Sequence, residues 1–248
     1  MAKKNVVSDW NGTIFKYPTD EEQNKRIANE MKDRSIPFHP FILWRLKQAK
    51  YQIEERLDQY KKGNAELSEV YEPFNELVIN GLDLDFIYDT LDKFAEENSD
   101  KIDNNILEPI KNNKDKFETL GILSVSNDYS IEKILEESGY GGIFETIIAN
   151  HLIGNLGEGK AEELTLDIYG EKVEVFEEEF LKERNCRKNN TVYLGDSEDD
   201  EPIAEILVPG NFIVPFFASY EYKNRMSNKY SATVPEDRED LENYLLKG

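Results

Sequence analysis

The sequence is poor in the residues from which many protein sites are built. Its 248 residues include one cysteine, Cys186, and two histidines, His39 and His151. One cysteine excludes a disulfide within the chain and a thiolate-rich metal site, and two histidines leave little for histidine-based metal or acid–base chemistry. We expect Cys186 in a helix-end turn and structural or incidental places for both histidines. The chemistry of this chain is therefore expected to come from carboxylates.

Positive charge and long apolar runs are also scarce. Lys and Arg number 30 against 51 Asp and Glu, a formal net charge of -21. This balance argues against nucleic acid as a partner, because phosphate backbones are bound by clustered Lys and Arg. An anionic substrate would need a metal ion and locally placed donors. No run approaches the roughly 20 apolar residues of a membrane span, and no signal-peptide core is visible, so we expect a cytoplasmic protein without membrane contact.

Acidic motifs follow two short apolar runs. Asp9-Trp10-Asn11-Gly12-Thr13 comes after Val6-Val7, and Gly195-Asp196-Ser197-Glu198-Asp199-Asp200 comes after Thr191-Val192-Tyr193-Leu194. The first motif alone also fits an ordinary turn. However, open α/β sheets build their sites where strands end, and two acidic strand ends in one sheet can converge on one cation. Together the two motifs predict a cation site.

The stretch from about residue 17 to residue 119 has a helical pattern. Apolar residues repeat at spacings of three and four, at Ile42, Leu46, Ala49, Ile53, Leu57 and Tyr60 and at Leu84, Ile87, Leu91 and Phe94. Thr19 and Glu22 predict a capping box, and Pro37 and Pro40 separate the first helix from the second. We expect the aromatic residues Trp44, Tyr51 and Tyr60 to pack between helices.

After Gly121 the pattern changes to short apolar runs that alternate with amphipathic helices. Strands are predicted at 121–125, 146–149, 191–194 and 212–214, and helices at 130–138, 172–183 and 236–246. Alternation of strand and helix implies a mostly parallel sheet covered on both faces. The fold class predicted for this part is α/β.

The order of these motifs resembles that of the haloacid dehalogenase (HAD)-like hydrolase superfamily. A nucleophile, a hydroxyl, a lysine and an acidic pair follow one another at Asp9, Ser126, Lys172, Asp196 and Asp200. The phosphoserine-phosphatase-like branch is most similar, because residues 148–153 and then Gly159-Lys160-Ala161 look like its hairpin. The resemblance implies a Rossmann-like three-layer core of residues 1–14 and 119–248, with a helical cap inserted at residues 15–118.

The resemblance also implies roles for the site residues. It implies a phosphohydrolase that uses Mg²⁺, acts on a small phosphorylated metabolite and forms an aspartyl phosphate on Asp9. The Mg²⁺ ligands would be Asp9, Asp196 and the carbonyl of Asn11, with Asp200 as a further ligand or as a residue that orients the others.

The phosphoryl group would be received by other residues of the same motifs. Ser126 and Asn127 would donate hydrogen bonds to its oxygens, and Lys172 would neutralise the charge that builds up. Lys160 is the rival for this lysine. We favour Lys172 because it precedes an amphipathic helix that leads to the Asp196 strand, whereas Lys160 follows two glycines at a hairpin tip.

Two positions depart from the family pattern. Asn11 stands where phosphatases of this family usually have a second aspartate, which protonates the leaving group and then activates water. An amide cannot do this, and loss of a general acid–base typically removes about 10²- to 10⁴-fold of rate. Asp199 stands where this branch often has an asparagine that contacts the phosphate, and a carboxylate there repels a phosphate unless it turns to the metal or a lysine.

Three hypotheses remain open from the sequence. The first is a phosphohydrolase that is slow or selective for good leaving groups. The second is a family member that works at carbon or at a C–P bond. The third is a catalytically retired protein that binds a metal, a phosphorylated ligand or a protein partner. The retained Asp9, Ser126, Lys172, Asp196 and Asp200 favour chemistry, while the metabolite and the oligomeric state are left open.

Overall fold

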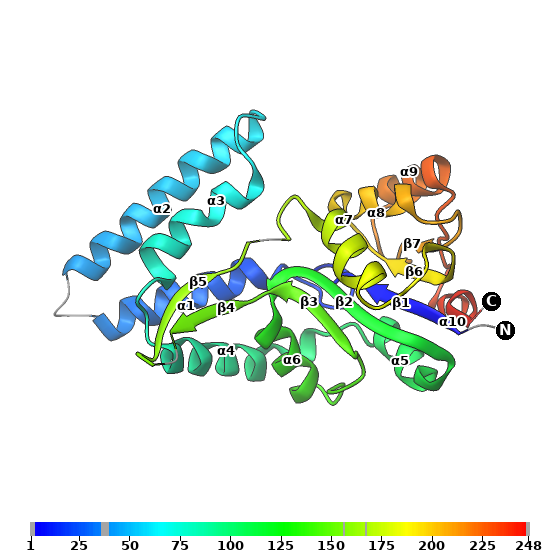
Figure 1. Cartoon of the computed structure of the whole chain (residues 1–248), viewed down its shortest axis with the longest axis horizontal. Helices are drawn as coiled ribbons and strands as arrows, with labels where there is room; N and C mark the ends of the chain where they lie inside the picture. Colours follow the sequence, from blue (N-terminus) through cyan, green and yellow to red (C-terminus); the bar gives the residue numbers. More distant parts are fainter. Residues whose placement is uncertain (1–2, 36–39, 156, 167, 247–248) are drawn as a thin grey trace.

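The computed structural model describes residues 3–35, 40–155, 157–166 and 168–246, so Pro37 and His39 lie outside the described residues. Five parallel strands form the main sheet in the order β3-β2-β1-β6-β7 (Figure 1). Their bounds are β1 Lys4–Ser8, β2 Phe117–Asn127, β3 Thr146–Asn150, β6 Thr191–Leu194 and β7 Phe212–Ile213. This parallel sheet confirms the α/β prediction.

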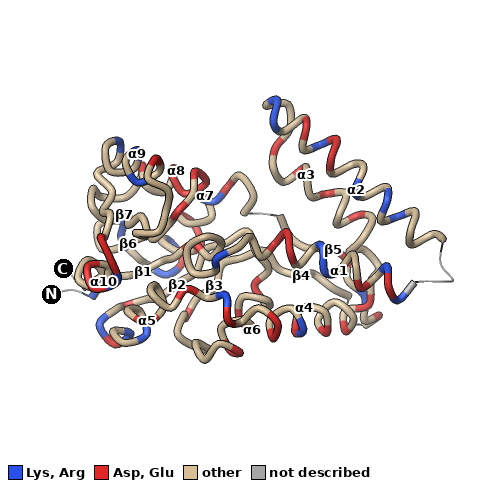
Figure 2. Tube along the Cα trace, turned by 180° about the vertical axis from the view of Figure 1, so that it is seen from behind, with Lys and Arg blue, Asp and Glu red and all other residues tan. Residues whose placement is uncertain are grey.

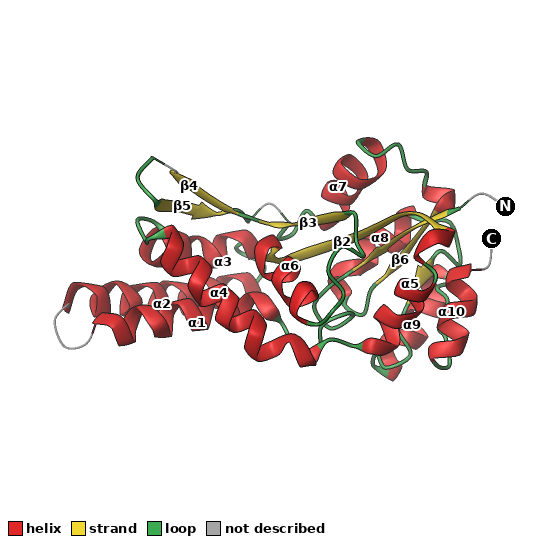
Figure 3. Cartoon of the chain, turned by 90° about the horizontal axis from the view of Figure 1, so that it is seen from below, coloured by secondary structure: helices red, strands yellow, loops and turns green. Residues whose placement is uncertain are grey.

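Helices cover both faces of this sheet because its central strands are buried on both sides. Val6 packs in one hydrophobic cluster and Val7 in another, as the alternation of side chains along a strand requires. The Val6 cluster includes residues of α5 Asn104–Asn112, α6 Asp128–Glu137 and α10 Arg238–Leu246. The Val7 cluster includes residues of η4 Phe176–Lys182, α8 Glu201–Ile206 and α9 Tyr220–Tyr230. The result is the three-layer arrangement that the resemblance implied (Figure 3).

Another group of helices extends to one side of the sheet (Figure 1). They are α1 Thr19–Ser35, α2 Pro40–Lys61, α3 Leu67–Phe74, the π-helical turn η1 Asn75–Ile79 and α4 Leu84–Asn98. A hairpin of β4 Leu152–Asn155 and β5 Lys160–Leu164 lies with them, and its Ala161 belongs to their hydrophobic cluster. The division into a 1–14 and 119–248 core and a 15–118 cap stays a prediction.

The aromatic residues of α2 do not pack as predicted. Trp44 and Tyr51 are 52% and 62% exposed, and Tyr60 is 40% exposed. Ala49 is the buried residue of this helix, and Trp44 stacks instead on Phe41, which is itself exposed. The prediction was wrong because α2 lies at the margin of the fold, where the helices around it cover one side of it (Figure 1).

Three further features concern the helices. The predicted helix 172–183 is a short α-helix, α7 Lys172–Val175, that continues as the π-helical η4. Among the described residues, no helix combines the length and the apolar character needed to cross a membrane. Acidic and basic residues are interspersed along α2 and the other helices (Figure 2).

Candidate active site

Three carboxylates meet at the carboxyl edge of the sheet. Asp9 directly follows β1, and its backbone N–H donates to the carbonyl of Leu194 at 2.8 Å. Asp196 follows β6, and Asp200 ends the 3-10 turn η6 Glu198–Asp200. Each carboxylate offers an oxygen, and these oxygens lie within 4.8 Å of one another. Asp9 and Asp200 are buried, at 4% and 0% exposed, and Asp196 is partly buried.

Two glycines make room for these carboxylates. A Cβ at Gly12, whose φ is +80°, would lie 2.3 Å from Oδ2 of Asp196. A Cβ at Gly195 would lie 2.5 Å from Oδ2 of Asp200. Real Cβ atoms do not approach other atoms so closely, so any larger residue would displace the carboxylate. The glycines of both acidic motifs are therefore part of the construction of the site.

Lys172 is the cation at this cluster. Its side chain is buried, and Nζ donates to Oδ1 of Asp9 at 2.7 Å and to Oδ1 of Asp200 at 2.6 Å. Burial alone would lower the pKa of Lys172, but the charges of Asp200 and Asp9 outweigh it and raise that pKa above its usual value. The rival Lys160 lies on β5 and pairs with Asp83 at 3.4 Å instead.

Burial also raises the pKa of two carboxyl groups in the cluster. It raises the pKa of Asp9 well above its usual range, although the charge of Lys172 opposes it. It raises the pKa of Asp196 to about 6, against a hydrogen bond from the hydroxyl of Thr13 at 2.7 Å. One lysine thus faces three carboxylates. Hard carboxylate oxygens at this spacing suit Mg²⁺, and a divalent cation would offset the excess negative charge.

Asp200 has four hydrogen bonds within the protein. Its Oδ1 accepts from Lys172 and, at 2.9 Å, from the hydroxyl of Tyr193. Its Oδ2 accepts from the backbone N–H and the hydroxyl of Ser197, at 3.3 and 3.2 Å. The sequence left two roles open for Asp200, as a further metal ligand or as a residue that orients the others. These four hydrogen bonds favour the second role, in which Asp200 orients Lys172 and the turn at Ser197.

The Asn11 side chain is held within a polar network. Its Oδ1 accepts from the N–H and the hydroxyl of Thr19, both at 2.9 Å, and from the hydroxyl of Ser126 at 3.1 Å. Its Nδ2 donates to Oδ1 of Asp20 at 3.1 Å, and Oδ2 of Asp20 accepts from the hydroxyl of Tyr169 at 2.8 Å. Asn11 therefore joins the start of α1, the end of β2 and the segment before α7.

This network uses groups for which the sequence suggested other roles. The hydroxyls of Thr19 and Ser126 also lie within hydrogen-bond distance of each other, so one of them donates to the other while the second donates to Asn11, and the Ser126 side chain is fully buried. The Thr19 hydroxyl thus bonds to Asn11 and Ser126 and does not form the predicted capping box with Glu22.

Asn127 caps α6, since its Oδ1 accepts from the N–H of Ser130 at 3.2 Å, which leaves its Nδ2 as the donor for a ligand. Asp199 lies exposed on η6.

Sequence reasoning missed several members of the site. Thr13, which holds Asp196, lies within the first motif and could have been found from its place in that turn. Asp20 and Tyr169 gave no usable signal, because they are 149 residues apart in the chain and meet only in the fold. Tyr193 was included only as part of the apolar run before Gly195. The structure thus brings Asp9, Lys172, Asp196 and Asp200 together, and it places Asn11 and Ser126 in the adjoining network.

No protein-family model matches the sequence, and no curated protein matches it. Among solved structures, a substrate-bound phosphoserine phosphatase is similar at a TM-score of 0.58 and 17% identity, over 99% of this chain and 98% of that chain. A putative HAD-hydrolase from Bacillus subtilis bound to magnesium gives a TM-score of 0.52 and 17% identity, over 99% of both chains. A HAD family hydrolase from Salmonella enterica gives 0.61 and 13%, over 100% of this chain and 72% of that chain. The chain therefore has the fold of the HAD-like hydrolases and shares it with the phosphoserine phosphatases.

Proposed function

We propose that this chain is a Mg²⁺-dependent phosphohydrolase that acts on a small phosphorylated metabolite, with Asp9 as the nucleophile. The observation that carries the proposal is the buried Lys172, whose Nζ bridges Asp9 and Asp200 while Asp196 lies within reach of the same point. Mg²⁺ held by Asp9, Asp196 and the carbonyl of Asn11 would supply positive charge that lets a phosphate approach a carboxylate. The fold shared with phosphoserine phosphatases supports this reaction class.

The proposed reaction has two steps. An oxygen of Asp9 attacks phosphorus, the bond from phosphorus to the leaving-group oxygen breaks, and phospho-Asp9 forms. Water then attacks the phosphorus of this intermediate and releases inorganic phosphate and the Asp9 carboxylate. Lys172 offsets the negative charge at the reacting centre. Asn127 donates a hydrogen bond to a phosphoryl oxygen, and Ser126 does the same once its hydroxyl turns away from Asn11 and Thr19.

The Asn11 network limits which phosphates can react. The leaving group receives no proton from Asn11, because its amide has no acidic proton and its oxygen already accepts from the N–H of Thr19 and from a neighbouring hydroxyl. Substrates that leave readily without a proton, such as acyl and aryl phosphates, should therefore react fastest. We propose that the enzyme is slow or leaving-group selective.

The test is hydrolysis of acetyl phosphate, p-nitrophenyl phosphate and phosphoserine with Mg²⁺ and with EDTA. We expect Mg²⁺-dependent turnover that is fastest on acetyl phosphate and disappears in Asp9→Asn and Lys172→Gln. Lys160→Gln is the matched control, since it removes an equal charge at an exposed site, and it should keep full activity. Turnover that survives in Asp9→Asn would refute the proposed nucleophile.

The Asn11→Asp variant in the same assay measures the effect of the missing acid. We expect a gain of about 10²-fold or more on phosphoserine and a much smaller gain on acetyl phosphate, since only the alkoxide needs a proton. The new carboxyl would face Asp20, whose own pKa burial already raises, so one of the pair would hold a proton at neutral pH. Equal gains on both substrates would contradict the general-acid argument.

One observation favours a second candidate, a retired enzyme that still binds metal. Asn11 and Ser126 are tied to each other and to Thr19, as expected of residues with a structural role. The same assay separates the two functions. If the wild type binds Mg²⁺ but turns over none of the three phosphates, and activity is absent or appears only in Asn11→Asp, the protein is a binding protein on a phosphatase frame.

A further inference from the structure

The outward side of α2 holds most of the exposed large apolar residues of the described chain. Five of the nine such residues lie on this one helix, and they are Phe41, Leu43, Trp44, Tyr51 and Tyr60. Phe41 is 64% exposed, although it is stacked on Trp44. Exposed apolar residues are ordinary when scattered, whereas a group of them on one surface marks a site of contact with another molecule. The helix α2, at the margin of the fold, is therefore the candidate surface (Figure 1).

Helical spacing places part of this group on one face. Trp44, Lys47, Tyr51 and Glu55 follow one another at intervals of three and four residues, and Phe41 precedes Trp44 by three. This line of residues is called the α2 face. Its first half carries the stacked rings of Phe41 and Trp44. Its second half borders a shallow hollow of about 460 Å³, which is lined by Gln48, Tyr51, Gln52, Glu55, Arg56 and Gln59. The face thus has an aromatic end and a hollowed, polar end.

The two halves of α2 also differ in charge. Between residues 41 and 60, the exposed charged residues are Lys47 and Lys50 in the first half and Glu54, Glu55 and Asp58 in the second. Lys50 and Glu54 form an ion pair at 3.8 Å within the helix, whereas no ion pair in the described part of the chain involves Lys47 or Glu55. A surface with one basic and one acidic end is complementary to the same surface turned end to end.

The charge of α2 has the opposite sign to that of the whole chain. Two copies with a net charge of -21 repel each other over a distance. The helix has five basic and three acidic residues, against 30 and 51 in the whole chain, and its basic residues are spread along its length (Figure 2). Repulsion between two copies is therefore weaker at α2 than the net charge suggests.

We propose that the α2 face binds the same face of a second copy of this chain, with the two helices antiparallel. A twofold axis near Tyr51 then sets the aromatic end of each face on the hollowed end of the other, and Lys47 of each copy faces Glu55 of the other. A parallel pair would instead place Lys47 against Lys47 and Glu55 against Glu55. A membrane surface fits less well, because helices that lie on anionic lipid have a basic polar face, and one half of α2 is acidic.

The size of the α2 face makes the proposed dimer a reversible one. A helix of 22 residues is about 33 Å long and about 10–12 Å across, so two of them in contact bury roughly 800 Å² in total. Contacts of this area are typical of weak and transient complexes, for which we expect a dissociation constant of roughly 10–100 µM. None of Asp9, Lys172, Asp196 and Asp200 lies on α2, so this dimer is independent of the proposed phosphohydrolase activity.

Sedimentation velocity between about 1 and about 500 µM protein tests for this dimer. The buffer contains about 0.15 M NaCl, which screens the repulsion between the net charges but not contacts within the interface. We expect a monomer–dimer equilibrium in wild type, and a dissociation constant that rises about tenfold or more in Trp44→Gln, since a few buried residues, often Trp, dominate an interface. Tyr220→Gln is the matched control, because Tyr220 is an aromatic residue of α9 that is 77% exposed, and it should leave the constant unchanged.

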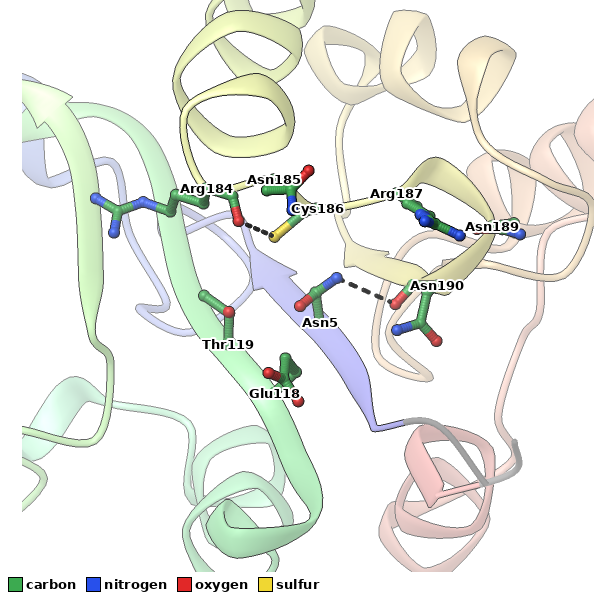
Figure 4. Close-up of a pocket in the computed structure, with 9 residues that line it drawn as sticks. All are labelled: Asn5, Glu118, Thr119, Arg184, Asn185, Cys186, Arg187, Asn189 and Asn190. Carbon is green, nitrogen blue, oxygen red and sulfur yellow. Dashed lines mark hydrogen bonds between the residues drawn. The ribbon is translucent and has the colours of Figure 1, made fainter.

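Charge reversal tests the antiparallel arrangement. Lys47→Glu and Glu55→Lys should each raise the dissociation constant about tenfold, because each places two pairs of like charges in the interface, and the double variant should return it to within about twofold of wild type. Arg184→Glu makes the same change in net charge as Lys47→Glu, at an exposed residue beside a polar cavity at the amino ends of β1 and β2 (Figure 4), and should have no effect. A monomer at every concentration, a dimer unaffected by Trp44→Gln, or a double variant as weak as either single one would overturn the proposal.

Trp44 also reports where the contact forms. The other tryptophan, Trp10, is fully buried, so quenching of the fluorescence by acrylamide follows Trp44. We expect this quenching to decrease as the dimer forms. A dimer that leaves Trp44 as accessible as in the monomer would place the interface elsewhere, and protection of Trp44 only by phosphatidylserine vesicles would assign the face to a membrane. Either result would refute the pairing of two α2 faces.

Discussion

At the scale of single residues, Asp196 differs from its two acidic neighbours. Asp9 and Asp200 each accept a hydrogen bond from Lys172, whereas Asp196 accepts one from the neutral hydroxyl of Thr13. A partly buried carboxylate without a direct cationic partner favours its protonated form, and this burial accordingly raises the pKa of Asp196 to about 6. The charge of Asp196 therefore destabilises the metal-free protein and is available to stabilise the metal-bound one.

This difference predicts how stability depends on pH. A folded pKa above the unfolded value of 3.8 means that the folded state binds more protons between about pH 4 and pH 6, so stability falls as pH rises through that range. In EDTA, Asp196→Asn should become more stable relative to wild type by roughly 1 kcal/mol between pH 5 and pH 7. Urea unfolding of both proteins at the two pH values measures this change.

The control for this measurement is Glu239→Gln, which removes the same charge from an exposed position of α10. Its stability relative to wild type should not change between pH 5 and pH 7 in the same way. Added Mg²⁺ at pH 7 should stabilise wild type and have little effect on Asp196→Asn. A constant difference between wild type and Asp196→Asn across pH would show that Asp196 titrates as an ordinary exposed carboxyl.

The sequence was sufficient for residues whose place follows from one element. Asp9 and Asp196 follow strands, and Lys172 begins a helix, so the carboxyl edge of a parallel sheet brings them together. It was insufficient for the surroundings of Asn11. Its bonds to Ser126 and, through Asp20, to Tyr169 join segments more than 100 residues apart, and no local pattern specifies such contacts.

At the scale of elements, strands and helices were predicted where periodicity is strong. The strands 191–194 and 146–149 correspond to β6 and β3, and the helix 130–138 corresponds to α6. The packing of the β4–β5 hairpin against helices that precede it was not predictable, because Gly154 makes this contact possible: a Cβ there would lie 2.7 Å from the Leu84 side chain. Contacts of this kind depend on tertiary structure and not on the period of one segment.

The turn after β1 offers a test of how an element shapes the site. Gly12→Ala puts a methyl group where Oδ2 of Asp196 lies, at a backbone φ of +80°. We expect two effects: a loss of about 1 kcal/mol or more from backbone strain, and loss of the stabilisation by Mg²⁺ because Asp196 is displaced. Thermal unfolding with Mg²⁺ and with EDTA gives both quantities.

Gly63→Ala separates the two effects. Gly63 has a similar φ of +72° in the turn after α2, but a Cβ there would meet no atom within 4 Å. This variant should therefore lose a similar amount of stability from strain and keep its full response to Mg²⁺. An unchanged Mg²⁺ response in Gly12→Ala would mean that Asp196 is not required for metal binding.

At the scale of the whole molecule, the charge opposes the proposed substrate. A net charge of -21 surrounds a site that must accept a phosphate in the proposed reaction, and acidic residues occur on the helices of both outer layers (Figure 2). Unscreened, this field lowers the local concentration of an anion near the site. Lys172 and the proposed cation offset this repulsion locally. Salt screens their short-range interactions with the substrate much less than it screens the long-range field.

Ionic strength should therefore increase substrate capture. With Mg²⁺ saturating, raising NaCl from low concentration to about 0.15 M shortens the Debye length to about 8 Å, which screens the distant carboxylates but not contacts within the site. We expect KM for acetyl phosphate to fall severalfold while kcat stays nearly constant, because the proposed chemical step depends on Asp9 and Lys172, which are in direct contact. Sucrose at equal osmolality controls for effects other than screening. A KM that rises with salt would show instead that a positive field near the site guides the substrate, and that the acidic surface has no part in its approach.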